Sequence, residues 1–470
     1  MLYEGSIGPQ IGNYLRSYIP NTLVKLNNRI DYDLRFAQYL LSSVVAILNN
    51  TTISTIFCIL CLLLAANLLV VLGNNSNNTI VGSFGNDIKK IGNQRLDTNI
   101  VLVWNNLTTK LGIDEKLTPP EFARVYALVH ISIYDSLIAA TEGKEASLSY
   151  FDNGDNNKSS FYVNVIAEAV SNVLLYLFPN YAHDIIKLKS TQIGQFPSNN
   201  DGNLSIKKAS MIGHRVSQAI INYAETDNSD IVWNKNIITI LSVKNSTNCN
   251  WNGTNPVNPT AGFWKTYILK SGAEIQPKGP EPCGSEDDLL DLKETYEIWK
   301  HRTPNQIKAV HYWGNKPPPV IWNSILNQHI QKYYKNMSIL DAAYVNAYLN
   351  VGMYDAFVSC WYTKYGYWSA RPFQRVPNIT TEIPTPNFPS YTSGHSVISM
   401  VASRVLGEMF PNEKDYFHNQ AIEAGLSRIW AGIHFKQDVI QGMNQGDKIA
   451  DKALEDMHKP YSPFIYTTFR

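Results

Sequence analysis

Apolar residues recur at three- and four-residue spacing along much of the chain, which is the pattern of helices that bury one face. One such run begins at the Pro119-Pro120 pair, which the first turn of a helix tolerates, and continues to Leu137. The apolar alternation and tight-turn signals of β proteins are missing from the sequence. The pattern therefore predicts an all-α fold, with further helices over Phe161–Leu177, Ile206–Ala224, Leu340–Trp361, Ser393–Met409, Tyr416–Trp430 and Val439–Met457.

Two stretches of the helical pattern occur twice. The series Ala123-x-Val125-x-Ala127, which leads to Tyr134-Asp135, recurs as Ala343-x-Val345-x-Ala347 leading to Tyr354-Asp355. The run from Ser171 to Asn180 then reappears, in the same order, from Ser403 to Asn412. Amphipathic helices can converge on similar patterns, but two matches in one order favour a repeat. We therefore predict one domain over residues 98–470, made of two related bundles over about 98–225 and 292–470, with a connection over 226–291.

The stretch from Ile53 to Leu72 carries no charge and is long enough to cross a hydrocarbon core of about 30 Å as a helix. A cleavable signal peptide starts within a short basic segment, whereas residues 1–52 come first here, so an uncleaved transmembrane anchor fits better. A buried core helix is the alternative, although core helices rarely lack a polar face over such a length. Residues 73–97 are rich in Asn and Gly and are predicted to be a flexible linker.

Basic residues lie on both sides of this span, so they do not determine which side of the membrane carries the domain. Asn-x-Ser/Thr triplets suit a glycosylated, extracytoplasmic domain, although an Asn-rich chain also produces them by chance. Among the five cysteines, Cys249 and Cys283 could form a disulfide or remain two thiols. The triplets that follow the span begin at Asn74, Asn77, Asn106, Asn157, Asn203, Asn245, Asn252, Asn336 and Asn378.

The overall charge is nearly balanced, with 40 Lys and Arg against 39 Asp and Glu. Such a chain has no net field that would attract nucleic acid, and we expect no nucleic-acid partner. The length of 470 residues and the 44% share of hydrophobic residues allow a substantial core. The sequence does not indicate an oligomeric state.

Two segments of the second bundle carry groups that suit an oxyanion. Lys364 and Arg371 offer a point charge and a planar fork, the two geometries that hold the oxygens of phosphate or vanadate. Ser393, Gly394 and His395 stand directly ahead of an apolar helix, where free backbone amides and the helix dipole favour a negative ligand. Taken alone, the first pair also fits a solvated surface and the second segment an ordinary helix cap.

A third segment adds Arg428, His434 and Asp438. Asp438 follows His434 by four residues, so its carboxylate can accept a hydrogen bond from one ring nitrogen. The other ring nitrogen then offers its lone pair to an electrophilic centre. Taken alone, this pair also fits a His–Asp contact on a solvated helix face.

In chain order, Lys-x6-Arg-Pro, Ser-Gly-His and Ser-Arg-x5-His-x3-Asp form a specific set. The set resembles that of the superfamily joining type 2 phosphatidic acid phosphatases, bacterial acid phosphatases and vanadium-dependent haloperoxidases. The likeness is greatest to chloroperoxidase-like haloperoxidases, which have counterparts of Trp361 and Phe388. The resemblance spans roughly Thr98 to Leu454, and this chain has the expected residue at every charged and catalytic position of the motifs. One departure is Thr392, which replaces the proline usual before Ser-Gly-His.

This resemblance implies a vanadate cofactor, with hydrogen peroxide and halide as substrates. His434 would be the metal ligand, His395 the acid–base group, and Lys364 would polarise the peroxide. Trp361 and Phe388 would line the halide pocket. The vanadate oxygens would be held by Lys364, Arg371, Arg428, Ser393 and the Gly394 amide.

The same residues would also serve a phosphatase without a cofactor, in which His434 attacks the phosphorus of a phosphate ester and His395 protonates the leaving group. The motifs do not separate the two chemistries, but the apolar wall that Trp361 and Phe388 would provide favours a haloperoxidase. A lipid phosphatase is disfavoured because only one span is evident. The third alternative is a non-catalytic oxyanion-binding surface protein, which the loss of a motif residue would favour.

Overall fold

The computed structural model describes residues 96–141, 156–193, 200–233 and 249–465. Within these residues all regular elements are helices, apart from an isolated bridge between Asn250 and Ser369. The predicted all-α class is therefore confirmed. The predicted anchor over Ile53–Leu72, the segment before it and nearly all of the linker after it lie outside the described residues.

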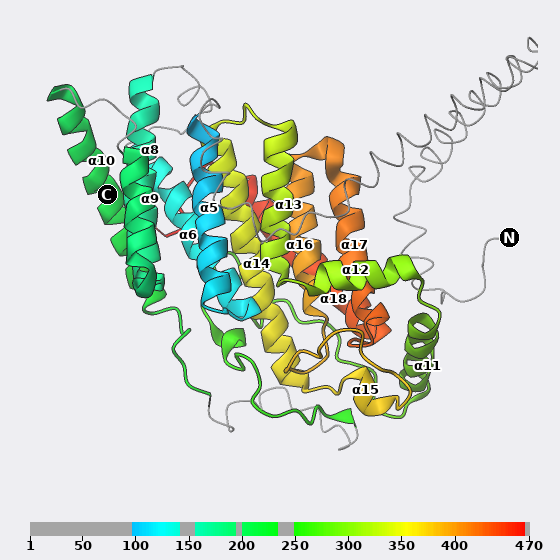
Figure 1. Cartoon of the computed structure of the whole chain (residues 1–470). Helices are drawn as coiled ribbons and strands as arrows, with labels where there is room; N and C mark the ends of the chain where they lie inside the picture. The colour runs from blue at the N-terminus through cyan, green and yellow to red at the C-terminus, as the bar shows by residue number, and fades with distance from the viewer. Residues whose placement is uncertain (1–95, 142–155, 194–199, 234–248, 466–470) are drawn as a thin grey trace, which may run out of the picture. The chain divides into compact units, whose positions relative to one another are not determined.

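The first bundle contains five of the described helices and is drawn from blue to green in Figure 1. In this bundle α8 packs against α6, α9 and α10, and α5 packs against α6. Their bounds are α5 Leu96–Asp114, α6 Pro119–Ala140, α8 Asn156–Leu177, α9 Ala182–Ile193 and α10 Asn200–Ala224.

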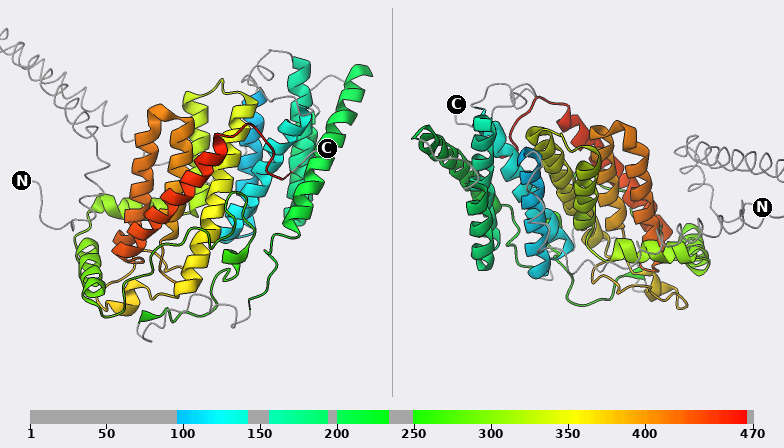
Figure 2. Two further views of the ribbon diagram at one scale, coloured as in Figure 1. Left: turned by 180° about the vertical axis from the view of Figure 1, so that it is seen from behind. Right: turned by 45° about the horizontal axis from the view of Figure 1, so that its top comes forward.

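The second bundle is built around α16, which packs against α14, α17 and α18. Helix α14 also packs against α6 of the first bundle, so the two bundles share one core. The views in Figure 2 show the first-bundle helices on one side of α14 and the orange-red helices on the other. The bounds are α13 Pro318–Tyr333, α14 Ile339–Tyr367, α15 Pro372–Arg375, α16 Gly394–Met409, α17 Lys414–Trp430 and α18 Lys436–Met457.

Helices α11 (Glu286–Lys300) and α12 (Pro304–Gly314) lie where the hydrophobic pattern alone predicts none. Both carry capping signals in the sequence. Ser285 accepts a hydrogen bond from the Asp288 N–H, and Thr303 with Gln306 forms a capping box behind Pro304. These short polar signals start the two helices, although their apolar faces are narrow.

The repeated sequence runs have matching structures. Helix α8 ends before a short 3-10 turn at Pro179–Tyr181, and α16 ends before the same kind of turn at Pro411–Glu413. In each copy the aspartate of the Tyr-Asp pair holds a separate segment through backbone N–H groups. Asp135 accepts from Phe464 and Ile465, each at 2.9 Å, and Asp355 accepts from Tyr267, Ile268 and Leu269 at 3.0, 2.8 and 2.8 Å.

Buried asparagines join the two bundles. Asn105 of α5 donates to Asn323 of α13 at 2.8 Å, and Asn323 donates to Asn350 of α14 at 2.7 Å. All three side chains are buried, where a polar group costs free energy unless it is hydrogen-bonded. The chain of amides therefore favours one arrangement of α5 against α13 and α14.

Two described helices are long and apolar enough to cross a membrane, namely α6 and the Ser160–Leu177 part of α8. Most of their side chains are buried inside the protein, as in core helices of soluble domains. Their length and composition are therefore weak evidence for a membrane span.

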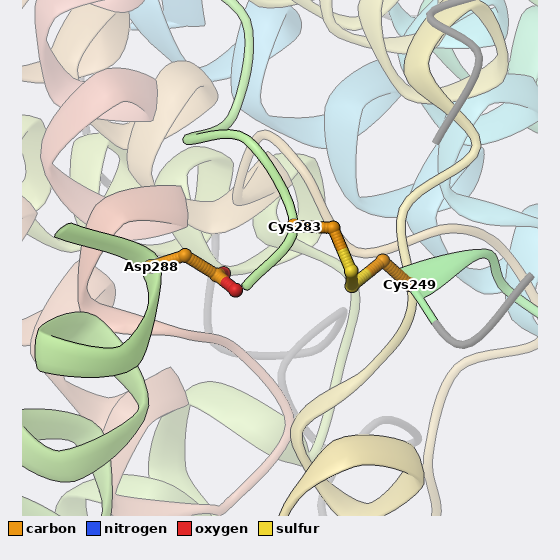
Figure 3. A group of neighbouring side chains, drawn as sticks. All are labelled: Cys249, Cys283 and Asp288. Atoms are coloured by element: carbon orange, nitrogen blue, oxygen red, sulfur yellow. A yellow bond between two sulfur atoms is a disulfide. The ribbon is translucent and has the colours of Figure 1, made fainter. Parts of the chain in front are cut away.

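Cys249 and Cys283, 34 residues apart, form a disulfide in the structure. Asp288 lies beside it, as Figure 3 shows. The Asp288 carboxylate accepts two hydrogen bonds from Arg375, at 2.7 and 2.6 Å, and one from the Gly284 N–H at 2.7 Å. Cys249, Cys283 and Asp288 therefore form a disulfide next to an ion pair. The two sulfur atoms are not available as thiolate ligands for a metal.

Candidate active site

Lys364 and Arg371 are both fully buried and hold the same turn of the chain. The Lys364 ammonium donates to the carbonyl oxygens of Pro389 and Ser390, at 3.1 and 2.7 Å. The Arg371 guanidinium donates through Nε and one terminal nitrogen to the Phe388 oxygen, at 3.0 and 2.8 Å. The two cations therefore bond to neighbouring carbonyl oxygens of one turn, Phe388–Ser390, and can serve several oxygens of one anion.

The helix that carries Lys364 is longer than the sequence pattern predicts. The predicted end at Trp361 is wrong, because α14 continues to Tyr367 and includes Lys364 in its last turn. Trp368 closes the helix with a φ of 52°, and its N–H bonds to the Lys364 oxygen. Glycine usually takes this left-handed position, so the sequence lacks the ordinary stop signal.

His434 lies between Arg371 and Asp438. Its Nδ1 is 3.0 Å from Oδ2 of Asp438, and its Nε2 is 3.1 Å from a terminal nitrogen of Arg371. Helix α18 begins at Lys436, so His434 precedes it and Asp438 lies in its first turn. The side chains of His434 and Asp438 are only 3% and 2% exposed, which does not fit a pair on a solvated helix face.

Asp438 fixes the orientation of the His434 ring. Its Oδ2 also accepts the Phe435 N–H at 3.1 Å, so the carboxylate is tied to the start of its own helix. A carboxylate next to Nδ1 favours the tautomer with a proton on Nδ1, which leaves the Nε2 lone pair toward Arg371. The pair can therefore present one nucleophilic or metal-binding nitrogen beside a guanidinium.

Ser393 is the N-cap of α16, and Gly394 is its first residue. The Ser393 hydroxyl accepts from the Ser396 N–H at 3.4 Å, and its own N–H donates to the Asp438 carbonyl oxygen at 2.9 Å. The start of α16 therefore meets the start of α18. Both helix N-termini carry partial positive charge, which favours a negative ligand near them.

His395 and Arg428 both bond to the last turn of α12. The His395 Nε2 lies 2.8 Å from the Trp313 carbonyl oxygen, and an Arg428 terminal nitrogen donates to the Val310 oxygen at 3.2 Å. Trp313 is itself anchored, since its Nε1 donates to Glu423 at 3.0 Å. A carbonyl acceptor at Nε2 leaves Nδ1 of His395 with a lone pair that can take a proton.

The site has an excess of buried positive charge. Among the residues that the structure describes, no carboxylate forms an ion pair with Lys364, Arg371 or Arg428. Burial lowers the pKa of Lys364 to about 7, that of Arg371 to about 10 and that of Arg428 to about 9. The Asp438 carboxylate acts on Lys364 and Arg371, but three cations still outnumber it, and buried positive charge in excess is costly, so the arrangement favours a bound anion.

Both imidazoles of the site are neutral in this environment. Burial lowers the pKa of His434 well below its usual value, and the charges of Arg371, Lys364 and Arg428 lower it further. Burial, followed by the Arg428 charge, has the same effect on the pKa of His395. Arg371 lies 3.1 Å from Nε2 of His434, and Lys364 bonds to the carbonyl oxygen of Ser390, whose hydroxyl lies 3.3 Å from Nδ1 of the same ring.

Trp361 and Phe388 form an aromatic wall next to the two cations. Their ring centroids are 4.9 Å apart, and the Lys364 ammonium lies 5.1 Å from the Phe388 centroid. The Arg371 guanidinium carbon is 5.0 Å from the same ring. Trp361 is buried and Phe388 is partly exposed, so one side of the cationic region is apolar.

Sequence reasoning missed Ser390. Its hydroxyl donates to Oδ2 of Asp438 at 2.5 Å and lies 3.3 Å from Nδ1 of His434. The residue stands inside the Phe388–His395 segment, but a serine in a loop carries no signal that distinguishes it from its neighbours. The contact exists only because α18 folds back against this loop.

Comparisons with known proteins identify the fold. The family model of the VCPO second helical-bundle domain matches residues 412–463, which include Arg428, His434 and Asp438. A bacterial vanadium-dependent iodoperoxidase crystal structure is similar, with a TM-score of 0.61, 22% identity, and coverage of 77% of this chain and 97% of that one. A comparison with curated protein sequences finds no match.

Two structures of bacterial vanadium-dependent chloroperoxidase are also similar. The holo form has a TM-score of 0.58 with 14% identity, over 73% of this chain and 93% of that one. The apo form has a TM-score of 0.59 with 14% identity, over 73% and 96%. The predicted resemblance to the vanadium haloperoxidases is therefore confirmed, and the fold is the helical-bundle fold of these proteins.

Proposed function

We propose that this chain, which has the fold of the vanadium-dependent haloperoxidases, is itself a vanadate-dependent haloperoxidase that oxidises halide with hydrogen peroxide. One observation carries the proposal. Three cations, Lys364, Arg371 and Arg428, are buried in the site, Arg371 lies 3.1 Å from Nε2 of His434, and among the described residues no carboxylate forms an ion pair with any of the three. Such a site is made for a small, highly charged anion.

The donor set fits vanadate. His434 would ligate the vanadium through Nε2, because Asp438 occupies the Nδ1 side of the ring. Lys364, Arg371, Arg428, the Ser393 hydroxyl and the Gly394 amide would hold the oxygens. When bound, vanadate supplies a Lewis acid that activates hydrogen peroxide toward halide without a change in the oxidation state of the metal.

The side chains of the site have separate tasks in this proposal. Asp438 keeps the proton of His434 on Nδ1, so Nε2 remains a ligand. His395 is neutral, and its Nδ1 can accept a proton from hydrogen peroxide while Nε2–H donates to the Trp313 oxygen. Lys364 balances the negative charge that develops on oxygen during the reaction.

Trp361 and Phe388 are the proposed lining of the halide pocket. A halide carries a single charge and is weakly hydrated compared with vanadate, so it suits an apolar wall beside a cation. The Lys364 ammonium lies near both rings, at 5.9 Å from the Trp361 centroid and 5.1 Å from that of Phe388. This arrangement favours the halide chemistry over hydrolysis of a phosphate ester.

The decisive experiment uses the full chain purified in detergent, with and without orthovanadate. It is offered bromide plus hydrogen peroxide and, in a separate reaction, a chromogenic phosphate ester. We expect bromination that requires vanadate and is lost in His434→Ala. The matched control is His183→Ala, which removes an exposed imidazole in the first bundle.

Each result of this assay has a definite meaning. Hydrolysis of the ester, inhibited by vanadate and without bromination, would replace the haloperoxidase by a phosphatase in which His434 is the nucleophile. Neither activity in the wild-type chain, together with tight binding of vanadate, would favour a non-catalytic oxyanion-binding protein. Activity that survives in His434→Ala would exclude both enzymes at this site.

We also propose that one helix over Ile53–Leu72 anchors the protein with its enzymatic domain on the extracytoplasmic side. The disulfide between Cys249 and Cys283 supports an oxidising compartment. Three of the triplets begin at exposed asparagines in turns or loops, Asn252, Asn336 and Asn378, which suits glycosylation. The test is protease protection in microsomes with glycosidase treatment, and digestion of the domain from the cytosolic side would refute the orientation.

A further inference from the structure

The N-terminus of α18 is capped by side chains of a different helix. The Lys436 N–H donates to the Thr295 hydroxyl at 3.0 Å, and the Gln437 N–H donates to Oδ1 of Asp291 at 2.9 Å. Both acceptors belong to α11 and are buried. The Lys436 ammonium forms an additional ion pair with Glu294 at 2.6 Å.

Helices are normally capped by the residue just before them. The N-cap of α18 is Phe435, whose side chain has no hydrogen-bonding atom, so the first free N–H groups of α18 depend on α11. His434 is the residue immediately before this N-cap. The position of α11 therefore sets where α18 begins and where the His434 ring lies.

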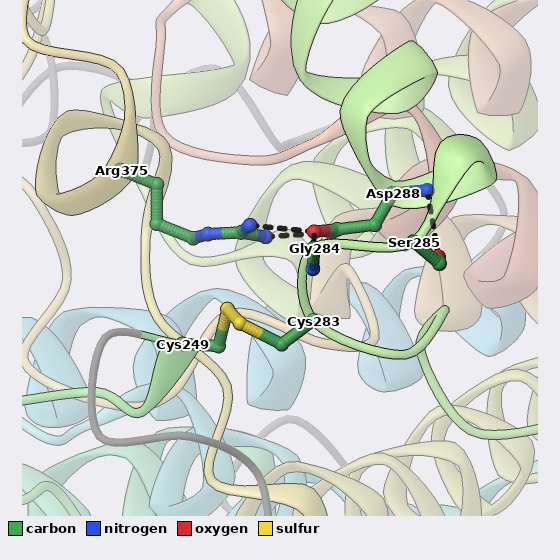
Figure 4. Close-up of a disulfide and its surroundings, with 6 residues drawn as sticks. All are labelled: Cys249, Cys283, Gly284, Ser285, Asp288 and Arg375. Carbon is green, nitrogen blue, oxygen red and sulfur yellow. Dashed lines mark hydrogen bonds and ion pairs between the residues drawn. A yellow bond between two sulfur atoms is a disulfide. The ribbon is translucent and has the colours of Figure 1, made fainter.

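The other end of α11 holds the segment of Arg371. Asp288, in the first turn of α11, makes the two hydrogen bonds to Arg375 described above, and Arg375 follows Arg371 by four residues. Figure 4 shows this ion pair next to the disulfide. Cys283 links to Cys249, whose carbonyl oxygen accepts the Ala370 N–H at 2.9 Å, directly before Arg371.

We propose that α11 is the positioning element of the oxyanion site, and that Thr295, Asp291 and Asp288 are its positioning residues. Through Thr295 and Asp291 it places His434, and through Asp288 it places Arg371, so one helix sets the separation of the two groups. None of the three touches the anion. The ligand class is a tetrahedral oxyanion, and the inference rests on the proposed function only in requiring that such an anion binds between these two residues.

The test measures anion affinity by isothermal titration calorimetry on the full chain in detergent, with orthovanadate in one series and inorganic phosphate in another. Thr295→Val keeps the shape of the side chain but removes the acceptor. We expect it to bind vanadate roughly tenfold more weakly, as is typical when a group that orients a ligand is lost. Thr295→Ser should restore most of the affinity, because it restores the hydroxyl.

Asp288→Asn tests the other end of α11, because it removes the charge that pairs with Arg375. We expect a similar weakening for this variant. The matched control is Asp287→Asn, which makes the same chemical change at an exposed position of the same helix. Affinities are compared only between variants whose far-UV circular dichroism matches that of the wild type, and if Thr295→Val fails this criterion, Asp288→Asn decides the question.

The outcomes separate this inference from the proposed function. A wild-type chain that binds neither anion refutes the proposed oxyanion site, and the inference fails with it. A wild-type chain that binds vanadate, with Thr295→Val and Asp288→Asn binding equally tightly, leaves the proposed function standing but overturns the positioning role of α11. A loss in Thr295→Val that Thr295→Ser does not repair also overturns it.

Discussion

A single oxygen of Asp438 receives hydrogen bonds from three directions, and this makes the residue sensitive to small changes. The Ser390 hydroxyl, the His434 Nδ1 and the Phe435 N–H all approach Oδ2, at 2.5, 3.0 and 3.1 Å. We predict that Asp438→Asn reduces vanadate-dependent bromination roughly a hundredfold, because an amide can turn its donor toward Nδ1 and favour the wrong tautomer. The measurement is kcat at saturating vanadate.

The control for this prediction is Asp451→Asn, which changes a largely exposed aspartate on the same helix. It should leave kcat unchanged, because exposed ion pairs contribute little. Equal kcat values for Asp438→Asn and the wild type would contradict the assigned role of the carboxylate.

His130 is the clearest titratable group outside the site. It is fully buried on α6, it stacks on Tyr126 with ring centroids 6.2 Å apart, and neither ring nitrogen has a hydrogen-bond partner among the described residues. Burial lowers its pKa to about 3. As the pH falls, His130 therefore binds a proton near pH 6.5 in the unfolded chain but only near pH 3 in the folded chain.

From this difference we predict that stability falls as the pH is lowered from 6.5 toward 3. The His130 contribution to the free energy of unfolding is about 1.4 kcal/mol per pH unit in that window, and it is absent above it. His130→Gln should flatten the pH dependence by this amount in urea unfolding at several pH values. His301→Gln, at an exposed histidine, should not, and an unchanged slope in His130→Gln would contradict the prediction.

At the level of single residues, the charged groups of the site could be predicted from the sequence, whereas its hydroxyl groups could not. Lys364, Arg371 and Arg428 could be predicted because the three motif segments occur in a specific order, whereas their burial is seen only in the structure. Ser390 and Thr295 could not, since serine and threonine occur everywhere and become significant only when two distant segments meet. The catalytic roles of the motif residues stay predictions until the assays above are done.

Between elements, two glycines of α18 allow close backbone contact with α16. A Cβ atom built at Gly446 would collide with the Val397 carbonyl oxygen of α16, and one at Gly442 would lie 2.9 Å from the Ser393 oxygen. Only residues without a side chain allow α18 to approach α16 this closely. The two glycines therefore bring the His434 and Ser393 segments together.

We predict that Gly446→Ala lowers the free energy of unfolding by about 2 kcal/mol, because the clash is with backbone that cannot move aside. Alanine is a better helix former by about 1 kcal/mol, so the clash must exceed this gain for the prediction to hold. Lys448→Ala, at an exposed position of the same helix, is the control. Urea unfolding measures both, and a more stable Gly446→Ala would show that α16 and α18 can separate without cost.

The apolar pattern predicts the helices with long apolar stripes and misses α5, α9 and α13 as well as α11 and α12, which begin at polar caps. The stripes of α6, α14, α16 and α17 are evident in the sequence, whereas α11 and α12 depend on Ser285 and Thr303 as caps. Helix boundaries near the site were displaced by three to six residues, for α18 and α14. Helix α18 starts where its first N–H groups meet the distant Thr295 and Asp291, and α14 ends at a left-handed Trp368 in place of the usual glycine, so the apolar pattern marks neither boundary.

For the whole molecule, the C-terminal segment connects the two bundles. Phe464 packs against Tyr134 of the first bundle and Tyr348 of the second, with ring centroids 5.8 and 5.0 Å apart, and its N–H bonds to Asp135. We predict that Phe464→Ala lowers the free energy of unfolding by about 2 kcal/mol through the loss of these contacts. Thermal and urea unfolding measure the effect.

Met211→Ala is the control, because Met211 is 57% exposed on α10 and its loss should change little. A Phe464→Ala variant as stable as this control would mean that the contacts of the C-terminal segment do not contribute to the free energy of unfolding. The relation between the two bundles could be predicted from the repeated runs, but the segment that ties them could not, because it has no counterpart in the repeat.

Both bundles have an aspartate that holds a separate segment through backbone N–H groups, Asp135 in the first and Asp355 in the second. Only the second bundle carries the cations Lys364, Arg371 and Arg428. Asp135 binds the segment of Phe464, and Asp355 binds the segment of Tyr267 in the connection between the bundles. Both aspartates are therefore needed for folding. In a saturation mutagenesis library selected for foldedness, both aspartates should therefore resist replacement equally. In a library selected for catalytic turnover, the first bundle should tolerate more substitutions than the second, and the positions around His434 should tolerate the fewest.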